Sequence, residues 1–136
     1  MRPLAPVLQR RIEATAMLTC AVSAYHLMGF SWGVFAACFF LPDLSMFFYL
    51  INPRVGGAVY NLAHFFLFPL VIGAIGVFGD HAGAQQAALL WGAHIAFDRA
   101  LGWGLKYEQS FCHTDMGLKE LAFPNRVLGP NPEGIL

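Results

Sequence analysis

Two histidines and two aspartates stand in otherwise apolar stretches of this sequence, and together they make up a ligand set for transition metals. His94 and Asp98 are four residues apart, so on a helix they share one face. Asp43 and His64 lie in two other apolar stretches. Imidazole and carboxylate ligands suit zinc, manganese or iron. These residue types therefore predict a divalent metal site, provided that the fold brings the stretches together.

The apolar stretches are long enough to be membrane-spanning helices. Of the 136 residues 57% are hydrophobic and 12% are charged, whereas an average soluble protein has about 25% charged residues. About 20 apolar residues cross a hydrocarbon core about 30 Å thick. Four stretches reach this length, with short connections between them: residues 9–29, 31–51, 57–79 and 82–107. The sequence therefore predicts an all-α fold, a four-helix transmembrane bundle, in a multi-pass protein of the inner (plasma) membrane.

The basic residues predict which side of the membrane holds the termini. All eight Lys and Arg fall on one side of the four-helix arrangement, and cytoplasmic loops carry the excess of such residues. Both termini are therefore expected in the cytoplasm, with residues 1–107 as the transmembrane domain and residues 108–136 as a cytoplasmic polar tail. The formal net charge is zero, which gives no reason to expect a nucleic-acid partner.

This orientation places polar residues of different helices at a similar depth. At a rise of 1.5 Å per residue, Asp43, His64 and Asp98 lie roughly 10–15 Å from the cytoplasmic helix ends, and His94 lies one turn deeper. A charged group inside a bilayer costs at least about 2.5 kcal/mol and normally faces the interior of the helix bundle, where it can pair. We therefore expect the four side chains to converge. Pro42 is expected to kink its helix and open space at this level.

Two further polar residues complete the predicted site. Glu13, near the start of the first helix, is predicted to be the general base or a further ligand, and Asn61 is predicted to orient a ligand or the substrate. A bound metal would lower the pKa of coordinated water to about 7 and create a nucleophile. This chemistry predicts a membrane-embedded metal-dependent hydrolase whose lipid-like substrate enters from the side.

The side chain of Arg99 is expected to point away from the site. One helical residue turns the chain by 100°, so Arg99 cannot share the face of Asp98. Its long stem can carry the guanidinium to the headgroups at the interface.

A structural or proton-carrying cluster is the alternative. Side chains such as Asn61 and His64 can hydrogen-bond across a membrane bundle, at about 0.6–2 kcal/mol each. Asp98 can pair with Arg99, and histidine changes charge near neutral pH, as a proton relay requires. The chain would then be a non-enzymatic membrane protein, either a proton-linked transport module, which would need a homodimer, or an accessory subunit.

The polar tail carries a weaker chelating pattern. Cys112, His113 and Asp115 stand close together after the last apolar stretch. The three cysteines of the chain are too scattered to predict a disulfide framework.

The polar motifs resemble those of one family. The stretches "PDLSMFFYLINPRVGGAVYNLAHFFLFPL" (42–70) and "HIAFDRALGWGLKY" (94–107), together with "RRIEA" and "GFSW", are similar to the domain-of-unknown-function 4260 family of small bacterial membrane proteins. The resemblance covers about residues 10–117. It implies a four-span membrane protein and no assigned activity. A looser similarity, in the Pro-Asp that precedes a His-containing stretch, links the chain to membrane-bound metal-dependent hydrolases.

Overall fold

The computed structural model describes residues 6–105, 113–114 and 117–118. The described chain is helical apart from one antiparallel pair of two-residue strands, β1 (His113–Thr114) and β2 (Gly117–Leu118). The all-α class predicted from the sequence is therefore confirmed. The helices are α1 (Pro6–Leu27), α2 (Trp32–Cys38), the 3-10 helix η1 (Leu41–Leu50), α3 (Pro53–Ala63), α4 (Leu67–Phe78) and α5 (Ala82–Leu101).

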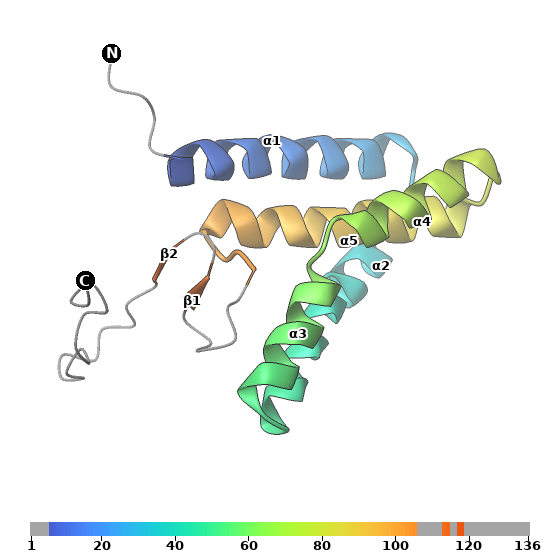
Figure 1. Ribbon diagram of the computed structural model, residues 1–136. Coiled ribbons are helices and arrows are strands. Elements are labelled where there is room, and N and C mark those ends of the chain that lie inside the picture. The colour runs from blue at the N-terminus through green and yellow to red at the C-terminus, as the bar shows by residue number, and fades with distance from the viewer. Residues whose placement is uncertain (1–5, 106–112, 115–116, 119–136) are drawn as a thin grey trace, which may run out of the picture.

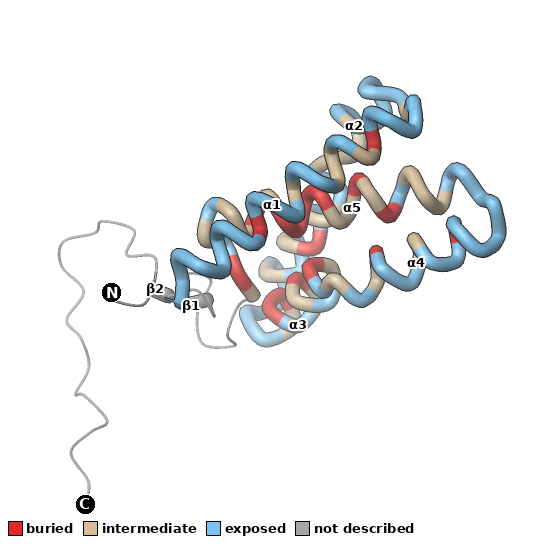
Figure 2. Tube along the Cα trace, turned by 90° about the horizontal axis from the view of Figure 1, so that it is seen from above, coloured by how far each residue is buried: buried red, intermediate tan, exposed pale blue. Residues whose placement is uncertain are grey.

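Helix α5 is the centre of the fold. It packs against α1 and α4, while α3 packs against η1 (Figure 1). Figure 1 shows α3 leaving the group of α1, α4 and α5 at a steep angle. Buried residues, red in Figure 2, are most frequent along α5, whose buried positions include Ala93, His94 and Ile95. The described helices therefore do not form one bundle of four straight, nearly parallel helices.

Prolines explain why two of the apolar stretches are broken. Helix α2 ends at Cys38, four residues before Pro42, and the chain continues as the 3-10 helix η1. A second break separates α3 from α4, just before Pro69. Proline has no N–H, and its ring collides with the carbonyl four residues earlier, which for Pro69 belongs to Phe65. The sequence predicted a kink at Pro42, and the structure has a complete break between α2 and η1 there; a second break precedes Pro69.

Glycines let neighbouring helices approach closely. A Cβ atom added to Gly56 of α3 would lie 2.7 Å from the Cα atom of Tyr49 in η1. One added to Gly76 of α4 would lie 2.7 Å from the backbone nitrogen of Gln85 in α5. Small residues allow such close backbone packing between membrane helices. These contacts set the spacing of the two helix pairs.

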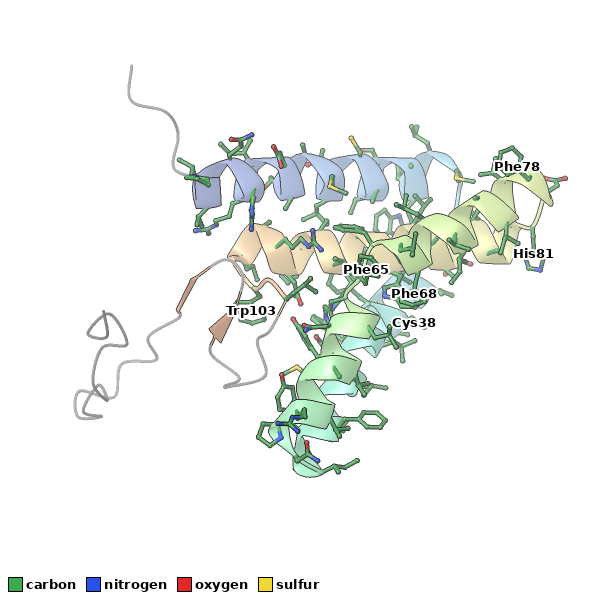
Figure 3. The ribbon with its side chains drawn as sticks, in the orientation of Figure 1. Cys38, Phe65, Phe68, Phe78, His81 and Trp103 are labelled. Atoms are coloured by element: carbon green, nitrogen blue, oxygen red, sulfur yellow. The ribbon has the colours of Figure 1, made fainter. Side chains whose placement is uncertain are left out.

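Two helical stretches of the described chain are long and apolar enough to cross a membrane, Trp32–Leu50 and Pro53–Phe78. Large apolar side chains are exposed on them, and Phe78 at the end of α4 is 91% exposed (Figure 3). Helices α1 and α5, with 22 and 20 residues, have the length but are less apolar. The number of spans and the side on which the termini lie stay predictions.

Candidate metal centre

The four predicted ligands come from helix breaks or helix ends. Asp43 stands in the first turn of η1, directly after Pro42. His64 is the C-terminal cap of α3, where φ is −104° and ψ is 17°. His94 and Asp98 lie in the last two turns of α5. Interrupted helices supply ion and substrate sites in many membrane proteins, because the backbone changes direction there and side chains from several elements can meet.

The structure brings these four side chains together. One ligand atom from each residue lies within 4.8 Å of the others. The Nε2 atom of His64 is 3.2 Å from His94 Nε2, 3.3 Å from Asp98 Oδ2 and 3.6 Å from Asp43 Oδ1. The Nε2 atom of His94 is 3.4 Å from Asp43 Oδ1 and 3.8 Å from Asp98 Oδ2. The convergence predicted from their common depth is confirmed.

These separations resemble the edges of a tetrahedron around a metal ion. Zinc binds histidine nitrogen and carboxylate oxygen at about 2.0–2.2 Å, so ligand atoms in a tetrahedral shell are about 3.3–3.6 Å apart. The five separations given above run from 3.2 to 3.8 Å. Five of the six edges of a tetrahedral shell are therefore close to these lengths, and one ligand atom from each of the four residues lies within 4.8 Å of the others.

The backbone of Tyr60 sets the tautomer of His64. The Nδ1 atom of His64 is 2.9 Å from the carbonyl oxygen of Tyr60, and a carbonyl oxygen can only accept a hydrogen bond. Nδ1 therefore carries the hydrogen, and in the neutral ring Nε2 presents a lone pair to the cluster. Metal-binding histidines are usually supported in this way, with the other ring nitrogen donating to a carbonyl or carboxylate.

The cluster combines two carboxylates with little access to solvent. His94 is fully buried, and the side chains of His64 and Asp98 are 4% exposed. In the part of the chain that the structure describes, the ion-pair partners of Asp43 and Asp98 are these two imidazoles. With both imidazoles neutral, the cluster carries two negative charges. Buried charges are costly unless they are paired or bind a metal, and one divalent cation would balance them.

Asp43 forms the open side of the cluster. Its side chain is 31% exposed, unlike those of the other three residues. A substrate or a water molecule would therefore reach a bound ion most easily past Asp43.

Tyr60 supports two of the candidate ligands, although the sequence analysis did not single it out. Its hydroxyl group is 3.2 Å from Asp98 Oδ2, and its ring stacks on His64 with centroids 3.8 Å apart and an interplanar angle of 16°. Tyr60 is 2% exposed. The signal in the sequence is the spacing of Tyr60 and His64, which are i and i+4 and therefore share a helix face.

Glu13 and Asn61 are placed differently from the four ligands. Glu13 is exposed on α1, where its Oε1 atom accepts a hydrogen bond of 3.1 Å from Gln9. No contact within the described residues joins Glu13 to the cluster. Asn61 is half-buried on α3, next to Tyr60. The catalytic roles assigned to Glu13 and Asn61 stay predictions.

Arg99 lies over the ring of Phe66, the N-terminal cap of α4. Its Cζ atom is 4.6 Å from the centroid of the Phe66 ring, a distance typical of a cation–π contact. Its predicted reach to the headgroups stays a prediction. Cys112 and Asp115 lie outside the described residues, and His113 is described only as part of strand β1.

Comparison with curated proteins and with solved structures finds no match. One family matches the chain over residues 8–118, which is most of its length, and it is described as a domain of unknown function (DUF4260). The matched range contains all four residues of the cluster and agrees with the resemblance in the motifs. The chain therefore belongs to the DUF4260 family.

Proposed function

We propose that this protein is a membrane-embedded metalloprotein in which Asp43, His64, His94 and Asp98 bind one divalent metal ion, and that it hydrolyses a lipid-like substrate. The observation that carries the proposal is the spacing of the four ligand atoms, which suits one ion. The tautomer of His64, and the two carboxylates that meet there, of which Asp98 is buried, support it. Zinc, manganese and iron all accept this ligand set.

The ion would supply an activated water molecule. A metal lowers the pKa of bound water to about 7, so that hydroxide forms at neutral pH. Hydroxide would add to a carbonyl or phosphoryl centre of the substrate, the bond to the leaving oxygen would break, and that oxygen would take up a proton. Glu13 is exposed and makes no contact with the cluster within the described residues, so its role as general base rests on the sequence alone. The metal ligands therefore carry the proposal.

The number of protein ligands bears on which ion would serve this reaction. Four ligands fill a tetrahedral zinc shell, whereas octahedral ions such as manganese keep two positions for water and substrate. Hydrolysis therefore favours an octahedral ion or the displacement of Asp43, which is the most exposed ligand. A lipid-like substrate is supported by the two helices that are apolar enough to cross a membrane.

A structural metal site in a non-enzymatic membrane protein is the second candidate. The specific observation that favours it is the complete set of four protein ligands, which is typical of structural zinc. Such an ion would hold η1, α3 and α5 together. Removing the metal from a structural site would unfold the protein, whereas removing it from a catalytic site would abolish lipid hydrolysis and leave the helices folded.

The test is the metal content of the full chain, purified without a polyhistidine tag and measured by inductively coupled plasma mass spectrometry. We expect stoichiometric metal in the wild type and its loss in His64→Ala and in His94→Ala. His26→Ala is the matched control, because His26 is exposed on α1 and is not among the four clustered residues. A wild-type protein without metal, or a double His64→Ala/His94→Ala variant that keeps it, would contradict the proposal.

A further inference from the structure

An apolar groove runs beside the candidate metal centre, between α2, η1, α3 and α5. Its volume is about 660 Å³, within the range of about 300–1,000 Å³ that is common for small-molecule sites. Pro42 and Leu44, on either side of Asp43 in the chain, line the groove, and so does Ala63, directly before His64. The groove therefore borders the elements that carry two of the four candidate ligands.

Helix α5 turns the same face to the groove and to the centre. Ala87, Leu90 and Trp91 line the groove and precede His94 by seven, four and three residues, which are the intervals of one helix face. The indole Nε1 atom of Trp91 also donates a hydrogen bond of 2.7 Å to the carbonyl oxygen of Ala63. This bond joins the α5 wall of the groove to the residue before His64.

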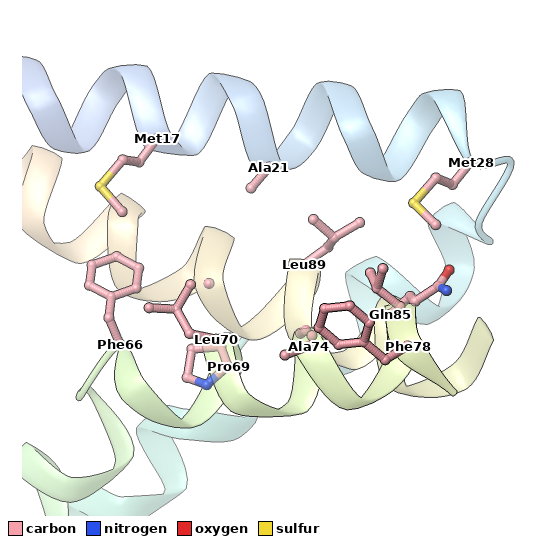
Figure 4. Close-up of a pocket in the computed structure, with 14 residues that line it drawn as sticks. Met17, Ala21, Met28, Phe66, Pro69, Leu70, Ala74, Phe78, Gln85 and Leu89 are labelled. Atoms are coloured by element: carbon pink, nitrogen blue, oxygen red, sulfur yellow. The ribbon is translucent and has the colours of Figure 1, made fainter. Parts of the chain in front are cut away.

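A second apolar groove lies on another face of α5. It is formed by α1, α4 and α5 and has a volume of about 490 Å³ (Figure 4). Leu89 and Ala74 are among its lining residues. Leu89 is five residues from His94 and therefore lies on a different face. This second groove provides an internal comparison for the first.

Ser45 is a polar group without a partner in the wall of the first groove. It is 7% exposed, and its hydroxyl group makes no hydrogen bond within the described residues. Buried hydroxyl groups are normally hydrogen-bonded, and an exception calls for an explanation. Rotation about χ1 between staggered positions can redirect this short side chain. The groove therefore suits an occupant that is mostly hydrocarbon and carries an oxygen acceptor near Ser45.

We propose that this groove binds one hydrocarbon chain of the lipid-like substrate, with an oxygen of its polar linkage accepting a hydrogen bond from Ser45. This inference rests on the proposed function, because the linkage would then lie beside the metal centre. Among the described residues, no charged side chain lines the groove. It is bordered by η1 and α3, which belong to the two stretches that are apolar enough to cross a membrane. In a membrane, lipid acyl chains are the apolar ligands present at high concentration.

The test uses the full-length, metal-loaded protein in phosphatidylcholine vesicles that contain a trace of phosphatidylcholine with a photoactivatable diazirine on one acyl chain. Labelled peptides are mapped by mass spectrometry. We expect labelling of η1 and α3 to exceed that of α1 and α4, which line only the second groove. Ser45→Ala should lower labelling of η1 and α3 about fivefold, the equilibrium effect of one typical hydrogen bond.

Two alanine-to-tryptophan variants form a matched pair. Ala87 and Ala74 are both exposed helical residues, one in each groove. Ala87→Trp should reduce labelling of η1 and α3 to the level of the second groove, and Ala74→Trp should leave it unchanged. Circular dichroism and metal content, measured on the same samples, verify that each variant is folded.

Equal labelling of both grooves in the wild type would overturn the proposal, because lipid would then coat the helices without selection. Unchanged labelling of η1 and α3 in Ala87→Trp would overturn it too, because the labelled chain would then lie outside this groove. The metal content of the wild-type protein shows whether a negative result concerns the groove or the proposed metal centre. Selective labelling of a wild-type protein that binds no metal contradicts the metal centre alone, and unselective labelling of a metal-replete protein contradicts the groove alone.

Discussion

At the scale of single residues, Tyr60 offers a test of how the candidate centre is supported. Tyr60→Phe keeps the ring that stacks on His64 and the backbone carbonyl that binds its Nδ1 atom, but it removes the hydroxyl contact to Asp98. Loss of such a supporting hydrogen bond typically weakens metal binding about tenfold or more. We expect this loss in a competition titration against a chelator of known affinity.

The control for Tyr60→Phe is Tyr25→Phe. Tyr25 is also fully buried, and its hydroxyl group donates to the carbonyl oxygen of Ser31 and accepts from Gln86, away from the cluster. This control should bind metal as the wild type does. Equal metal affinity in Tyr60→Phe and the wild type would show that Asp98 needs no support from the phenol.

Asp98 and Arg99 are neighbours in the chain with different expected roles. Asp98→Asn preserves the shape of the side chain and removes one of the two negative charges of the cluster. Loss of a charged ligand or its close support should weaken metal binding by about 10–100-fold. Arg99→Lys should bind metal normally, because the guanidinium lies over Phe66. Normal binding in Asp98→Asn together with lost binding in Arg99→Lys would mean that the two roles are reversed.

At the scale of helices, the close approach of η1 and α3 at Gly56 positions Asp43 against His64. A Cβ atom there would meet the backbone of Tyr49, so Gly56→Ala must push η1 and α3 apart. Overpacking of this kind costs about 1–3 kcal/mol. We expect a lower thermal midpoint in detergent, followed by tryptophan fluorescence, and weaker metal binding.

Gly92→Ala provides the matched control for Gly56→Ala. Apart from the adjoining backbone of α5 itself, no heavy atom of the described residues lies within 4 Å of a Cβ atom added at Gly92, and alanine favours a helix over glycine by about 1 kcal/mol. The thermal midpoint of Gly92→Ala should equal or exceed that of the wild type. A Gly56→Ala protein as stable as Gly92→Ala would mean that the contact of α3 with η1 tolerates an added methyl group.

At the scale of the whole molecule, the positions of the basic residues predict the orientation of the chain in a membrane. The one-sided distribution of Lys and Arg predicts that both ends face the cytoplasm. A reporter that is active only in the periplasm, fused after Leu136, should therefore be inactive, while a cytoplasmic reporter at the same position should be active. Activity of the periplasmic reporter would place the C-terminus outside the cytoplasm and would contradict the predicted orientation.

The sequence by itself determined the helical class and the four residues of the cluster. Long apolar stretches must satisfy their backbone groups internally, which a helix does. Polar side chains inside such stretches must find partners, which singled out Asp43, His64, His94 and Asp98. The spacing of His94 and Asp98 already placed them on one helix face.

Only the tertiary structure decided the geometry of the site. Sequence position gives the depth of a residue along its helix, but the direction of its side chain depends on how that helix is rotated against its neighbours. Glu13 shows this, because the packing of α1 on α5 leaves its side chain exposed. The steep angle of α3 and the close spacing of the four ligand atoms likewise depend on contacts between helices. Periodicity along a single chain does not encode such contacts, since they arise only when several elements pack together.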